Sequence, residues 1–373
     1  MEQIRFERIG ETMFHQVLDN GLNVFVFPKP EFQKKYAFFA TNYGGMDLRF
    51  QLDGTWHDTP AGVAHYLEHK MFDTREGNAL QQLTANGASP NAFTSNAITG
   101  YYFESTEENL RTLLSFVSVP YFTRESVEKE RGIIGQEIGM IEDDPNWTVF
   151  VNLLGALYEH HPIRTSVAGT VESISHITEE TLYACHKAFY DPANMVLCAA
   201  GDLDPQAVCR LAREVLPTQA GPIAEKDYGP EEPSRAARGL VEEHMAVSCP
   251  IFQLGCKGDA PVRGEAGLRQ ELLGDLACEV LLGTSTPLWQ SGGICCAHRN
   301  GNSPGPLLRH RNHRPHHGGK GRRCHWRRGG PGGRPGRGGG RGRPHRPGGC
   351  GSRPVGADQE GCLRQPGTQP QLL

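Results

Sequence analysis

The sequence changes character abruptly after Gln290, and this break confines any globular fold to the first 290 residues. The remaining 83 residues, 291–373, contain 22 glycines and 15 arginines but only 2 acidic residues. Apolar side chains are scarce there, so the segment cannot bury enough surface to offset the entropy lost on folding. We expect 291–373 to be a disordered, low-complexity basic tail.

The charge divides at the same point. The tail carries a net charge of +14, whereas residues 1–290 carry 22 basic and 40 acidic side chains, a net −18, and together they give the −4 of the whole chain. An acidic body is typical of a soluble protein and is a poor partner for nucleic acid. No apolar run approaches the roughly 18 residues that a membrane span requires, so we expect no membrane association.

The first residues and the cysteines both bear on the compartment. The opening "MEQIRFERIGETMF" lacks the apolar stretch of a secretory signal peptide. Six cysteines are scattered over residues 1–290 without a CxxC pair, a pattern of reduced thiols rather than of a disulfide framework. We therefore expect a cytoplasmic protein.

Strand-like and helix-like segments alternate through the first 215 residues, which indicates an α+β fold. Strands are predicted at 14–30 (a hairpin turning at Asn20-Gly21), 34–45, 91–105 and 194–204, and helices at 59–72, 125–145 and 178–192. Residues 216–235 are rich in proline, glycine and charge and are predicted to be a linker. A strand at 246–258 and a helix at 267–283 then restart the pattern, so 236–290 is interpreted as the start of a second, related unit that is incomplete.

The segment "AHYLEHKMF", residues 64–72, carries the chemistry. On a helix, His65 and His69 are one turn apart on the same face, so both can bind one metal ion. Glu68 borders that face and can reach a water on the ion, which makes H-x-x-E-H the inverted form of a zinc signature. A five-residue match also arises by chance, and three polar residues on an ordinary helix remain an alternative.

A catalytic zinc requires three protein ligands and one open position. The best candidate for the third ligand is Glu137, 68 residues after His69 on the predicted helix 125–145. Glu130 precedes it by two helical turns on the same face and can hydrogen-bond a ligand histidine. Either glutamate, taken alone, is equally interpretable as a solvated helix residue.

Three segments together resemble the insulinase, pitrilysin and mitochondrial processing peptidase family: "GVAHYLEHKMF", "GASPNAFTSNAITGYYF" and "ERGIIGQEIGMIEDDPNW". The resemblance extends from about Phe14 to Gln290 and is strongest to the bacterial branch, whose members are often paired subunits. It implies two related α+β units, each an antiparallel sheet with helices on one face, which close like a shell around an unfolded peptide.

The resemblance also implies roles for individual residues. His65, His69 and Glu137 match the ligands of one Zn²⁺ ion per chain, and Glu68 matches the general base. Glu130 matches a glutamate that supports the ligands from outside the metal site. Asn91 and Ala92 match the strand along which a substrate backbone is added as a further strand.

The resemblance thus divides the chain into a zinc-binding catalytic unit (1–215), a linker (216–235), the start of a second homologous unit (236–290) and the tail (291–373). Three origins of the tail stay open: an Arg-Gly nucleic-acid arm, a His/Cys metal-binding tract, or a shifted reading frame in a GC-rich gene. The break falls inside a predicted helix, and the tail has one Trp but no Phe or Tyr for base stacking. Both observations favour the shifted frame.

We therefore expect a zinc-dependent endopeptidase that hydrolyses peptides or unfolded segments, impaired by the loss of most of its second unit. Its partners would be a peptide substrate and a homologous subunit. Two alternatives remain: a non-catalytic subunit of a peptidase pair, and nucleic-acid binding through the tail.

Overall fold

The computed structural model describes residues 1–248, 250–258, 264–283, 285–287 and 307–309. Internal contacts divide the chain into residues 1–313 and 314–372, and every element below lies in the first part. The predicted disorder of the tail concerns residues that, except for Leu307–Arg309, lie outside the described ones.

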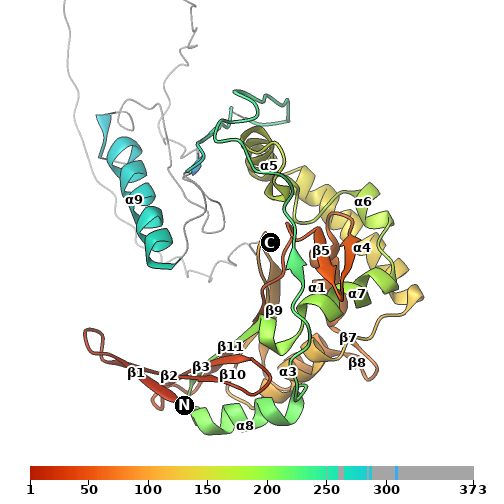
Figure 1. The fold of residues 1–373 in the computed structure, drawn as a ribbon, viewed down its shortest axis with the longest axis vertical. Helices are drawn as coiled ribbons and strands as arrows, with labels where there is room; N and C mark the ends of the chain where they lie inside the picture. The colour runs from red at the N-terminus through yellow and green to blue at the C-terminus, as the bar shows by residue number, and fades with distance from the viewer. Residues whose placement is uncertain (249, 259–263, 284, 288–306, 310–373) are drawn as a thin grey trace, which may run out of the picture. The chain divides into compact units, whose positions relative to one another are not determined.

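A seven-stranded sheet carries the fold (Figure 1). Its order is β1-β2-β3-β11-β4-β10-β9, and every neighbouring pair is antiparallel except β3 and β11. The strands are β1 (Glu2–Phe6), β2 (Glu11–Val17), β3 (Asn23–Pro28), β4 (Lys35–Thr41), β9 (Ser89–Thr94), β10 (Thr99–Ser105) and β11 (Met195–Gly201). The expected α+β class with a mainly antiparallel sheet is confirmed, and β9 forms one edge of that sheet.

Helices cover one face of the sheet, and every second residue of its strands points its side chain toward these helices. In β11, Met195, Leu197 and Ala199 are buried while the residues between them are half-buried. The helices that contact this sheet include α1 (Val63–Met71), α3 (Leu110–Ser118) and α8 (Pro205–Val215) (Figure 1). Period-two burial therefore sets a single core between the sheet and its helices.

The remaining elements surround this core. The helices are α2 (Ala79–Ala85), α4 (Arg124–Glu142), α5 (Pro145–Leu157), α6 (Val171–Ser175), α7 (Glu179–Phe189) and α9 (Gly264–Leu282). The short strands are β5 (Arg49–Leu52), β6 (Thr55–Asp58), β7 (Asp73–Thr74), β8 (Gly77–Asn78), β12 (Glu225–Lys226), β13 (Gln253–Gly255) and β14 (Leu307–Arg309). Within the described ranges, no helix is both long and apolar enough to cross a bilayer.

The predicted hairpin over 14–30 is confirmed as β2 and β3, although its loop contains three residues rather than two, because Leu18 N donates to Leu22 O. The single long strand predicted over 91–105 is wrong. The chain reverses between Ser95 and Ile98, whose N–H and carbonyl close the turn at 2.8 Å, and β9 and β10 pair as a hairpin. The turn contains no glycine or proline and has strand-forming residues on both sides, so the sequence does not indicate it.

The segment predicted as a linker is packed at β12. Lys226 Nζ donates to Asp47 Oδ2 at 2.9 Å and Tyr228 Oη donates to Asp47 Oδ1 at 2.9 Å. Burial raises the pKa of the Asp47 carboxyl, and the bonds from Lys226, Gly44 and Tyr228 oppose that shift. An unpaired buried carboxylate would be costly, so these contacts hold this stretch against the first unit.

Helix α9 lies in the predicted second unit and buries none of its residues. Five of its six leucines and its one valine are more than half exposed: Leu268, Leu272, Leu273, Leu276, Val280 and Leu281. An apolar face of this size normally packs against another element.

Two adjacent isoleucines of α4 test the packing of this helix. Ile134 is fully buried, whereas the side chain of Ile133 is 49% exposed. Ile134→Ala should lower the free energy of unfolding by about 2–5 kcal/mol, because it leaves a cavity in the core. Ile133→Ala, the matched control, should change it by less than about 0.5 kcal/mol. Urea unfolding of the full chain measures both values, and equal losses would contradict the assigned helix face.

Candidate metal centre

The histidines stand on a helix that is enclosed on nearly every side. In α1, Val63, Ala64, Tyr66 and Leu67 have no exposed surface. The Tyr66 hydroxyl donates to the Val127 carbonyl at the start of α4, and so joins the two helices. The side chain of His65 is therefore buried, and only 3% of the residue is exposed.

Helix α4 brings the predicted third ligand to these histidines. Glu137 Oε1 lies 3.7 Å from His65 Nε2, and Glu137 Oε2 lies 3.4 Å from His69 Nε2. The three candidate ligand atoms all lie within 4.8 Å of one another. His65 and His69, paired in the sequence by helical spacing, and Glu137, the candidate third ligand, thus form one group that could hold a metal ion.

The buried imidazole of His65 tests whether this group fits a metal. In the part of the chain that the structure describes, neither of its ring nitrogens has a hydrogen-bond partner. Buried polar atoms are almost always partnered in native proteins, so an orphaned pair requires an explanation. Two imidazoles and one carboxylate are a donor set of catalytic zinc sites. A metal ion at this group would satisfy one His65 nitrogen, and the residues therefore fit the ion.

The protonation behaviour differs among the three candidate ligands. Burial, and then the neighbouring His69, lowers the pKa of His65 to about 3, so at neutral pH its ring is neutral and one ring nitrogen offers a lone pair. Burial also lowers the pKa of His69, but its hydrogen bond to Glu130 and the charges of Glu68 and Glu137 outweigh this effect and raise that pKa. Burial raises the pKa of Glu137.

Glu130 orients His69. Its Oε1 lies 3.0 Å from His69 Nδ1, on the ring nitrogen that faces away from Glu137. The bond to His69 lowers the pKa of Glu130, which keeps this glutamate ionised as an acceptor. A carboxylate on Nδ1 fixes the proton there and leaves Nε2 free for a metal.

Glu68 is 7% exposed, and its Oε2 accepts a hydrogen bond from Thr94 Oγ1 at 2.7 Å. Burial raises the pKa of Glu68, and the Thr94 bond opposes this. Thr94 ends β9, the strand that also carries Asn91 and Ala92. The sequence interpretation missed Thr94. The feature that could have identified Thr94 is the alternation of side chains along β9, which places Ala92 and Thr94 on the same, core-facing side.

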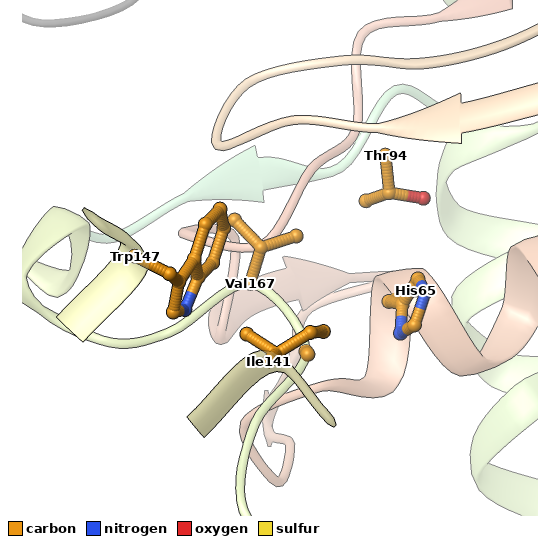
Figure 2. Close-up of a pocket in the computed structure, with 6 residues that line it drawn as sticks. His65, Thr94, Ile141, Trp147 and Val167 are labelled. Carbon is orange, nitrogen blue, oxygen red and sulfur yellow. The ribbon is translucent and has the colours of Figure 1, made fainter. Parts of the chain in front are cut away.

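A small hollow adjoins His65 (Figure 2). His65 and Thr94 line one end of it and Trp147 lies at the other, with Ile141 and Val167 between them, and Ala168 also lines it. These side chains come from α1, β9, α4, α5 and the loop before α6. Apart from His65 and Thr94 the lining is mostly apolar, so the metal group borders a low-dielectric wall.

The sequence matches two profiles of one peptidase family. Residues 53–171 match the sequence profile described as "Insulinase (Peptidase family M16)", and residues 176–291 match "Peptidase M16 inactive domain". The chain is 42% identical over 300 residues to the "Uncharacterized zinc protease YmfH" of Bacillus subtilis, covering 78% of this chain and 70% of that protein.

Solved structures agree with the fold. A putative M16-like peptidase from Alicyclobacillus acidocaldarius superimposes with a TM-score of 0.75 at 37% identity, covering 80% of this chain and 74% of that one. A protease from Helicobacter pylori superimposes with a TM-score of 0.67 at 20% identity, covering 80% and 75%. The fold and metal group define a class of metallopeptidase-like proteins. The chain belongs to the insulinase family, peptidase family M16.

Metal binding is the first test of the site. The full chain should bind one zinc ion, and His65→Ala should lose it, because the site then keeps only two ligands. His176→Ala, which changes an exposed histidine, should retain the ion. Zinc content after dialysis measures both, and a His65→Ala chain with a full equivalent of zinc would contradict the ligand assignment.

The affinity for zinc should fall as the pH is lowered through neutrality. Protons compete with the metal for His69, whose pKa is raised. His65, with a pKa of about 3, should add no such dependence above about pH 4. Competition with a chelator at several pH values measures this, and an affinity independent of pH between 5 and 8 would exclude His69 as a ligand.

Proposed function

We propose that the chain is a zinc-dependent endopeptidase that acts on peptides or unfolded polypeptide segments. The convergence of His65, His69 and Glu137, with the buried carboxyl of Glu68 beside them, carries this proposal. A non-catalytic subunit would have no need of a complete ligand set, so the same group disfavours that alternative.

The roles of the residues follow from their chemistry. Bound zinc would acidify a water molecule and polarise the scissile carbonyl. His65, His69 and Glu137 would hold the ion, and Glu130 fixes the ring of His69. Glu68 accepts a proton from the attacking water and then delivers it to the leaving amine. Its burial raises its pKa, which makes the carboxylate a stronger base than an exposed one.

The edge strand β9 provides a surface for the substrate. Among the described strands it pairs only with β10, so the backbone groups on its other side can pair with an extended peptide. Asn91 and Ala92 lie on this strand, three and two positions before the residue that contacts Glu68. A peptide added here would be bound through its backbone, which favours unfolded segments over folded proteins.

A homologous subunit, or a second copy of this chain, is the proposed partner. The sequence profile of the inactive domain ends at residue 291, and α9 buries none of its residues. Both observations support the proposal that the second unit is incomplete, and cleavage by this chain should then be slow. The exposed leucines of α9 also predict that the isolated chain aggregates at high concentration.

We also propose that 291–373 is read in a shifted frame. The match to the family ends where glycine and arginine begin to dominate. Sequencing the gene across the codons for Leu288 to Cys296 tests this. One inserted or deleted base that restores a helix and strands is the expected result, whereas an unaltered frame would contradict it.

Glu68→Gln tests the catalytic proposal. Glutamine keeps the size of the side chain but cannot accept the proton, so cleavage should fall by about 10²- to 10⁴-fold while zinc binding is retained. Glu128→Gln, on an exposed side chain of α4, should cleave like wild type. A quenched fluorescent peptide reports the rates, and a Glu68→Gln chain as active as wild type would remove Glu68 from the mechanism.

A further inference from the structure

We infer that Thr94 is a positioning residue that holds Glu68 in place and links it to the edge strand β9. The inference rests on the proposed function for its catalytic consequence, but the contact itself stands on geometry alone. Thr94 Oγ1 lies 2.7 Å from Glu68 Oε2, and both residues are buried, with 3% and 7% exposed.

The hydroxyl of Thr94 is directed at Glu68 by its surroundings. Behind it, Thr99 Oγ1 donates to the Tyr43 carbonyl at 2.9 Å and lies 3.4 Å from Thr94 Oγ1. The single proton of Thr99 is thus committed to Tyr43. Thr94 is left to donate its own proton to Glu68, the partner at 2.7 Å.

A hydroxyl suits both protonation states that a general base visits. It donates to the carboxylate before proton transfer, and it can accept from the carboxylic acid afterwards, because it has one donor and two acceptor positions. An amide or ammonium partner could not both donate and accept through one atom. The contact between Thr94 and Glu68 can therefore persist through the reaction.

The position of Thr94 is fixed by the turn that follows it. Gly45 N donates to Ser95 O at 2.9 Å and Met46 N donates to Asn96 O at 3.0 Å. A Cβ on Gly44 would lie 2.5 Å from Asn96 O, so only glycine permits this close approach. The turn after β9 is therefore held against residues 44–46, and this fixes the position of Thr94 beside Glu68.

This arrangement makes one strand serve two purposes. Its outer edge is the surface proposed for the peptide backbone, and its core-facing Thr94 holds the base. A peptide that shifts or tightens β9 would move Thr94 with it. The position of Glu68 thereby depends on the strand along which the substrate lies.

Thr94→Val removes only the hydroxyl and keeps the shape. We expect kcat to fall by about 10- to 100-fold, the usual effect of a misplaced catalytic group, with KM and zinc content unchanged. Thr94→Ser keeps a hydroxyl and should recover most of the rate. Thr41→Val is the matched control: this buried threonine of β4 donates to the Phe189 carbonyl, away from Glu68, and should cleave like wild type. Wild-type kcat in Thr94→Val would overturn the inference.

A second measurement does not depend on cleavage. The urea midpoints of four full-length, metal-free chains are compared: wild type, Thr94→Val, Glu68→Leu and the double variant. If Thr94 and Glu68 interact, the shift of the double variant differs from the sum of the two single shifts. If wild type cleaves no peptide, the proposed function fails, yet a non-additive shift still supports the contact. Additive shifts would overturn it.

Discussion

The structure depends on the packing of α1 against α4 inside the core. Because α1 is enclosed almost completely, His65 has no solvent to hydrate its ring, and among the described residues its nitrogens have no protein partner. Burial holds the ring neutral and the fold holds it still, which are the two requirements of a preorganised ligand. The free energy lost by leaving this imidazole unpartnered would be recovered when an ion binds.

Helix α4 contributes two carboxylates, both on one face, to the same site. Glu130 and Glu137 are seven residues apart, a rise of about 10 Å along the helix. The ring of His69 lies between them, with Glu130 at Nδ1 and Glu137 at Nε2. The capping box of Thr123 and Ser126 fixes the residue at which the helix begins. It thereby fixes where along the helix axis the two carboxylates lie.

Local periodicity explains how much of this could be read from the sequence. The spacing of His65 and His69 and that of Glu130 and Glu137 are properties of single helices, so they were predictable. The meeting of Glu137 with the histidines of α1 was expected from the resemblance and not from periodicity. Other contacts between elements were not predicted. Thr94 reaches Glu68 from a strand, and Lys226 reaches Asp47 across 179 residues. The turn after Thr94 was missed because its close approach to Gly44 is a tertiary contact, which strand propensity does not encode.

The central claim is that α1 and α4 together present His65, His69 and Glu137 to one zinc ion. X-ray absorption at the zinc edge of the full chain tests it most directly. We predict two imidazole nitrogens at about 2.0–2.1 Å and a carboxylate oxygen at about 2.0–2.2 Å, with one imidazole lost in His69→Ala and the carboxylate lost in Glu137→Ala. A sulfur ligand, or a first coordination sphere unchanged by both substitutions, would contradict the account.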